Sequence, residues 1–189
     1  MKQFYILILS LLLSACTGPT MRTAKTLDPG RYELIASSGV FYEPEDKYPT
    51  LDNFTFIAAT GVTDKIDTEA RLELPLGCVA LAPRYQIYST DTIDITTHLE
   101  AGMFLQEHAP LFLGTGINAG KSWEYIEGYG FYRNRLPTAG EDRWHSVGIG
   151  GRYYPKNSEH LFWGAEVATE TAIEGFYILK VSVGSGWRF

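Results

Sequence analysis

Residues 93–105, "IDITTHLEAGMFL", decide the fold. Apolar and polar residues alternate along this stretch with a period of two, which places them on opposite faces of a β-strand. One face carries Ile93, Ile95, Leu99, Ala101, Met103 and Leu105, and the other carries Asp94, Thr96, His98 and Glu100. A strand with one apolar face and one charged face indicates a sheet that separates two very different environments.

The same alternation recurs along most of the chain and predicts ten strands. They lie at about 30–42, 52–62, 66–74, 78–89, 93–105, 111–121, 124–133, 143–154, 160–170 and 173–189. The facing of 124–133 is ambiguous, because Glu127 falls on the same side as Tyr125 and Tyr129. Most segments run about 9–13 residues, which suits a tilted membrane strand of ~9–11 residues better than a globular strand of ~5–6.

We therefore expect an all-β fold, an antiparallel up-and-down transmembrane β-barrel over residues 30–189. The expected number of strands is about ten, with eight as the alternative. In such barrels apolar side chains face lipid and polar ones face the lumen. A soluble periplasmic sandwich is the competing fold, because its strands also alternate.

Charged residues on the inward faces are expected to pair with one another, because an isolated buried charge is costly. The predicted network consists of Glu69, Arg71, Glu73, Arg84, His98, Glu100, Arg152, Glu166 and Lys180. His98 and Glu100 lie two residues apart on one inward face and are the best candidates for catalysis, since His145 and Ser146, as neighbours on one strand, point to opposite faces. The four histidines are dispersed without ligand spacing, so we expect no metal and no cofactor.

The first residues have the layout of a secretory signal, with Lys2, an apolar stretch and small residues. Leu13-Ser14-Ala15-Cys16 resembles the bacterial lipobox. The resemblance implies removal of residues 1–15, acylation of Cys16 with palmitate or a similar chain, and a lipidated tether over 16–29. Thr17 stands where aspartate would favour the inner membrane, so the resemblance implies sorting to the outer membrane by the lipoprotein-sorting machinery.

The last residues, "SVGSGWRF", resemble the C-terminal signal by which bacterial barrels are recognised for assembly. The positions that match are Ser182, Gly184, Trp187 and Phe189. This implies the barrel-assembly machinery as a partner. Residues 61–74, "GVTDKIDTEARLEL", are more weakly similar to small outer-membrane transporter barrels.

A formal net charge of −6 argues against nucleic-acid binding. A barrel of about eight strands has a lumen that side chains or one small ligand fill, which argues against an open porin. The chain is therefore predicted to be a non-enzymatic structural barrel or one that binds or transports a small or lipidic ligand. The alternatives are a lipid-modifying enzyme of the outer membrane and a surface protein that interacts through loops 43–50 and 134–142.

Overall fold

The computed structural model describes residues 20–42, 48–51, 54–74, 77–105, 111–138, 143–158, 160–172 and 177–189. Within them the chain forms ten long strands and one short strand. These are β1 (Tyr32–Tyr42), β2 (Thr50–Leu51), β3 (Phe54–Thr63), β4 (Ile66–Leu74), β5 (Cys78–Ser89), β6 (Asp94–Phe104), β7 (Leu111–Ser122), β8 (Ile126–Pro137), β9 (Trp144–Tyr153), β10 (Leu161–Ala172) and β11 (Tyr177–Arg188). In the part of the chain described, no helix has the length and apolar character to cross a membrane.

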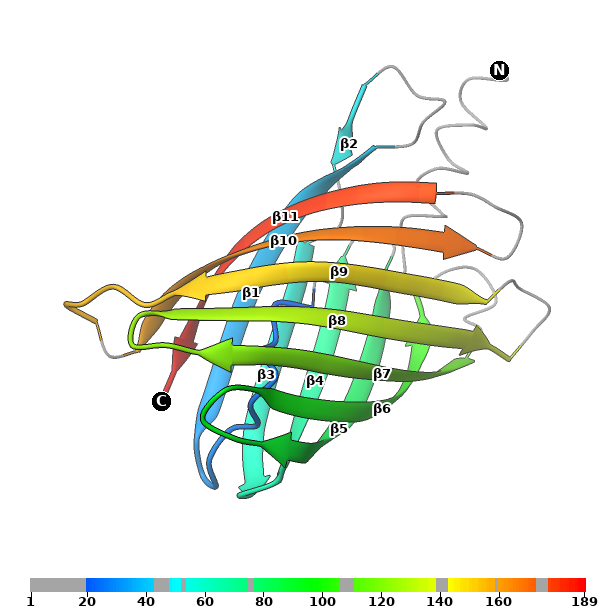
Figure 1. Ribbon diagram of the computed structural model, residues 1–189. Coiled ribbons are helices and arrows are strands. Elements are labelled where there is room, and N and C mark those ends of the chain that lie inside the picture. Colours follow the sequence, from blue (N-terminus) through cyan, green and yellow to red (C-terminus); the bar gives the residue numbers. More distant parts are fainter. Residues whose placement is uncertain are drawn as a thin grey trace, which may run out of the picture.

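The long strands form one closed antiparallel barrel (Figure 1). Each long strand pairs with the next in sequence, with β2 lying outside the series as a short partner of β1. The ring closes where β11 pairs with β1, from Glu33 opposite Arg188 to Tyr42 opposite Leu179. Phe189 extends this pairing, because its amide donates to the carbonyl of Tyr32 at 2.8 Å. Closure leaves no sheet edge, as a membrane-spanning sheet requires.

Side chains on the two faces of the barrel differ sharply in character. Outward residues are apolar and exposed, for example Leu99, Ile149 and Val183, which are 64%, 70% and 63% exposed. Inward residues include many buried charges, such as Glu33 and Asp67. An apolar outer surface around a polar interior is the pattern of outer-membrane barrels.

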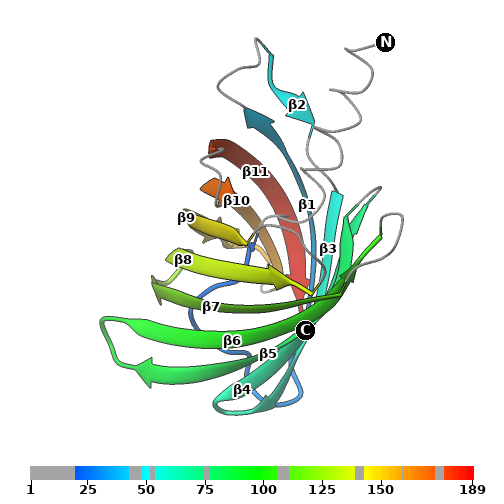
Figure 2. The same ribbon diagram turned by 90° about the vertical axis from the view of Figure 1, so that its right-hand side faces the viewer.

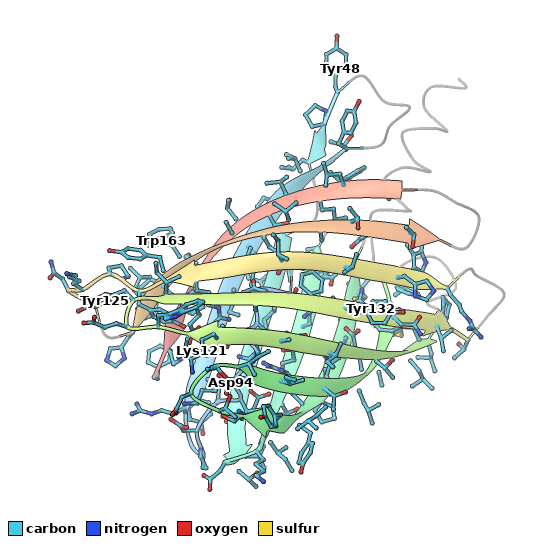
Figure 3. The ribbon with its side chains drawn as sticks, in the orientation of Figure 1. Tyr48, Asp94, Lys121, Tyr125, Tyr132 and Trp163 are labelled. Atoms are coloured by element: carbon cyan, nitrogen blue, oxygen red, sulfur yellow. The ribbon has the colours of Figure 1, made fainter. Side chains whose placement is uncertain are left out.

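The two ends of the barrel also differ. The links 64–65, 90–93 and 123–125 are short and lie at the end where β1 begins and β11 finishes, which we call the terminal rim. Exposed aromatic side chains surround this rim: Tyr32, Tyr85, Tyr88, Trp123, Tyr153, Trp163, Trp187 and Phe189. Figure 3 shows Tyr125 and Trp163 at this end and Tyr132 near the opposite end. Such an aromatic belt suits the level of lipid headgroups.

Ten strands and their antiparallel order are confirmed, and the alternative of eight strands is wrong. Bounds of the strands at 66–74 and 78–89 are as predicted. The loop predicted at 134–142 is wrong in part, because β8 continues to Pro137 with Arg133 and Arg135 on its inner face. In the other predicted surface loop, 43–50, residues 43–47 lie outside the described part of the chain, as do 139–142.

The facing of β8 resolves the ambiguity of its sequence. Tyr129 and Phe131 point inward with Glu127, and all three are buried. Two inward glycines of β9 make room for the rings. A Cβ at Gly150 would lie 2.5 Å from the Tyr129 ring, and one at Gly148 would lie 2.7 Å from the Phe131 ring. Aromatic side chains therefore help to fill the lumen, which the sequence pattern had assigned to polar groups alone.

The orientation of the outer face can be tested at Ile149, near the middle of β9. We expect Ile149→Arg to lower the free energy of unfolding in lipid vesicles by about 2–4 kcal/mol, because it places a charge among lipid chains. Urea titration monitored by gel mobility measures the change, with Ile149→Leu as the matched control. Equal stability of the two variants would contradict a lipid-facing position.

Candidate functional site

Residues 20–27 lie inside the barrel and are the central feature of its lumen. In both views the dark blue trace enters from the terminal rim and runs within the ring of strands (Figure 1 and Figure 2). We call the whole segment 20–27 the plug. Its buried residues are Thr20, Met21, Arg22, Thr23, Ala24, Thr26 and Leu27. Most of the described part of the expected tether over 16–29 is thus packed in the lumen. Cys16 and residues 17–19 lie outside the described residues.

Arg22 lies among three carboxylates of the barrel wall. Its guanidinium donates to Glu33 at 2.5 Å and to Asp67 at 2.6 Å, and its Nε lies 3.2 Å from Glu69. All four side chains are almost completely buried. The pairing neutralises charges that would otherwise be expensive to hold in the interior. We call Glu33, Asp67 and Glu69 the acidic recess.

Wall side chains also bind the backbone N–H groups of the plug. The carboxylate of Glu166 accepts from the amides of Thr20 and Met21, each at 2.9 Å. Asp67, besides binding Arg22, accepts from the amide of Leu27 at 3.0 Å. These contacts reach the two ends of the plug from β10 and β4, so both ends are held by the wall.

The carbonyl groups of the plug are bound as well. Arg152 donates to the carbonyl of Met21 at 2.8 Å through its Nε. Asn118 donates to Arg22 at 3.0 Å and Arg84 to Thr23 at 2.5 Å, while the Thr96 hydroxyl donates to Ala24. Four consecutive carbonyls therefore find donors on four different strands. This satisfies a stretch of irregular backbone that would otherwise be costly to bury.

Met21 occupies an apolar pocket of the wall. It packs with Ile35, Ile57 and Phe162, and Tyr154 lies against the same cluster. The guanidinium of Arg152 lies 4.1 Å from the centre of the Phe162 ring. Just beyond β9, the Tyr154 hydroxyl donates to Glu127 at 2.6 Å, and burial raises the pKa of this phenol. The phenol therefore stays protonated and remains a donor.

A second charged cluster lies between β4, β6 and β8. Arg135 makes two hydrogen bonds to the carboxylate of Glu100, at 2.9 and 2.7 Å, and lies 3.6 Å from Glu73. Arg71 donates to Glu69 at 2.9 Å, which connects this cluster to the acidic recess. Beside it, Phe104 and Phe112 stack at 4.7 Å and pack with Cys78 and Ala80. Charge pairs and rings thus occupy the lumen beyond the plug.

The structure places all nine predicted lumen charges on the inner face, each less than a tenth exposed. The cluster just described and its link to the recess contain Glu69, Arg71, Glu73 and Glu100. The plug is bound by Arg84, Arg152 and Glu166. The ammonium of Lys180 lies 3.3 Å from the carboxylate of Glu170. The predicted network omitted seven buried charged residues: Arg22, Glu33, Asp67, Glu127, Arg133, Arg135 and Glu170. Strand alternation places Glu33 and Asp67 on inner faces and could have found them, whereas no pattern marks Arg22.

The two catalytic candidates are both on the inner face of β6. Glu100 is engaged by Arg135, and in the register His98 lies opposite Arg84 and Gly116. No hydrogen bond joins His98 to Glu100 among the contacts described here. Among the described residues there is also no group of three or more His, Cys, Asp or Glu side chains that could hold a metal ion.

The residues of the predicted assembly signal lie along the closing strand. Ser182 is buried on the inner face, while Trp187 and Phe189 are about half exposed at the terminal rim. Gly184 pairs with Ser37 across the closure. Their recognition by the assembly machinery stays a prediction.

No family model matches the chain, and a search of curated protein sequences gives no match. Solved structures of membrane barrels do match. The outer membrane protease OmpT of Escherichia coli is 11% identical, with a TM-score of 0.49, covering 88% of this chain and all of that one. The translocator domain of autotransporter NalP from Neisseria meningitidis is 9% identical, with a TM-score of 0.47 over 84% and 88%. The N-terminal barrel of Pseudomonas aeruginosa OprF is 14% identical, with a TM-score of 0.41 over 86% and 100%.

The closed ring, the apolar outer surface and the charged interior together define the class: the chain has the fold of a bacterial outer-membrane β-barrel. Its particular feature is a lumen occupied by a segment of the same chain.

The role of Arg22 can be tested by removing its side chain. Arg22→Ala leaves the acidic recess without its main partner, so we expect a loss of about 3–5 kcal/mol in folding free energy. A lower unfolding temperature in detergent, followed by gel mobility, measures it. Lys25→Ala is the matched control, because Lys25 lies in the same segment but is exposed. Identical unfolding of both variants would show that the recess does not need the guanidinium.

Proposed function

We propose that the protein is a non-enzymatic outer-membrane barrel that is closed at rest by its own plug. The observation that supports this most directly is the set of hydrogen bonds that hold residues 20–27 across the lumen. Barrels of about eight strands already have narrow interiors, and here paired charges and aromatic rings occupy much of the remaining space. Such a barrel serves as a membrane-embedded scaffold rather than as an open channel.

We further propose that the chain is anchored to outer-membrane lipid through Cys16, as its lipobox suggests. Cys16 lies four residues before Thr20, and four residues span at most ~14 Å. The acyl chains would therefore attach close to the barrel, on the same segment that forms the plug. The lipid anchor and the contacts with the barrel wall would then both act on the short stretch from Cys16 to Leu27.

The closed state is tested by conductance across planar lipid bilayers. We expect the wild-type protein to give no steady openings. Arg22→Glu puts a negative charge beside three carboxylates, so we expect intermittent openings from that variant as the plug is released. Lys25→Glu, which changes an exposed residue of the plug by the same charge, should stay closed. Large steady openings of the wild-type protein would refute a closed barrel.

Lipid attachment is tested by metabolic labelling with radioactive palmitate. We expect label in the wild-type protein and none in Cys16→Ala. Cys78→Ala should keep its label, because Cys78 is a buried free cysteine on the inner face. Intact-mass measurement of the purified protein checks the same point. Label that survives in Cys16→Ala would rule out anchoring at this residue.

A further inference from the structure

The way the wall holds the plug resembles recognition of a ligand more than packing of a core. In the contacts described above, side chains from β4, β5, β6, β7, β9 and β10 bind backbone N–H and C=O groups of residues 20–27. Main-chain contacts of this kind supply affinity that does not depend on the bound sequence. A peptide that adopts the same irregular path, with Met21 at a φ of 43° and a bend at residues 24–25, could make them.

Two wall pockets add selectivity for side chains. The apolar pocket of Ile35, Ile57 and Phe162 receives Met21, and the acidic recess receives Arg22. A peptide without a cation at the second position would leave the recess charges without this partner, which is strongly unfavourable in a buried site. The wall therefore prefers an apolar residue followed by arginine.

The plug is joined to the barrel through an exposed link. Asp28, Pro29 and Gly30 are exposed, and Gly30 has a φ of +75° that favours glycine. Beyond this link, the contacts between the plug and the wall are non-covalent. The link supplies a high local concentration of the segment, but the binding groups belong to the wall.

From these features we propose that the lumen is a peptide-binding site whose resident ligand is the chain's own segment 20–27. The site takes peptides of the same chemistry, with an apolar residue followed by arginine, when the resident segment leaves. This inference rests on the proposed plugged state. The N-terminal segment of a second copy and a peptide from another protein share this chemistry.

The test uses the full chain with a protease site inserted after Asp28. After folding, cleavage turns the plug into a non-covalent ligand of an intact barrel. We expect a fluorescent peptide of residues 20–28 to exchange into the cleaved barrel and to saturate at one peptide per barrel. The uncut protein, whose segment stays tethered, should bind far less. Unlabelled full-length protein should compete only if segments exchange between copies.

Two altered peptides test selectivity. An Arg22→Glu peptide should bind about a hundredfold more weakly or worse, because it brings like charge to the recess. A Lys25→Glu peptide should bind like the wild-type peptide, because Lys25 is exposed. Equal binding of the two altered peptides would overturn the proposal.

The full-length Arg22→Glu protein provides a second route, because its own plug is weakened without cleavage. It should take up the wild-type peptide more readily than the unaltered protein does. If neither this variant nor the cleaved barrel binds the peptide, the inference fails. Conductance measurements distinguish failure of the two proposals. If the wild-type barrel does not conduct but the peptide does not bind, only the inference is wrong. If the wild-type barrel conducts, the proposed function is wrong.

Discussion

The contact between Arg22 and the acidic recess is the interaction on which the interior depends. Glu33 lies on β1, and Asp67 and Glu69 lie on β4, with β3 between the two strands. Their carboxylates converge on the guanidinium of Arg22 in the lumen. Wall arginines reach each of them as well. Arg152 lies 2.8 Å from Glu33, Arg71 lies 2.9 Å from Glu69 and Arg84 lies 3.6 Å from Asp67. Among the described residues, Arg22 is the one cation that contacts all three. A buried charge cluster is stable only when each member is compensated, and Arg22 brings to the centre of the cluster a positive charge that all three carboxylates share.

The lipid around the barrel is the reason that so many charged side chains lie in the lumen. Most outward positions of the strands are apolar because they face lipid, and a two-residue period then leaves the alternate positions for the lumen. Charged groups on a narrow inner wall are satisfied by other side chains of the wall or by a segment that enters the lumen. The protein uses both solutions: Arg135 and Glu100 pair between strands β8 and β6, while the plug satisfies Glu166 and Asp67.

The strands and their faces could be predicted because membrane and lumen impose opposite demands on neighbouring residues. The facing of residues could not be predicted for β8, where Tyr129 and Phe131 point inward against glycines of β9. An aromatic residue can face either lipid or lumen when glycines on the partner strand leave room for its ring. The plug could not be predicted at all. Its backbone N–H and C=O groups form hydrogen bonds with side chains up to 146 residues away in the sequence. The segment itself has no periodic pattern of apolar residues that would indicate burial.

The distribution of these partners also constrains how the barrel is completed. The plug precedes every strand in the chain, yet its ligands come from β1 through β10, and the ring closes only when β11 pairs with β1. Its full set of contacts therefore cannot exist before the last strands are in place. The segment must either wait at the mouth until the ring closes or be enclosed as β9 and β10 add Arg152 and Glu166 to the wall. In both cases the plug reaches its full set of contacts only once β9 and β10 are in place.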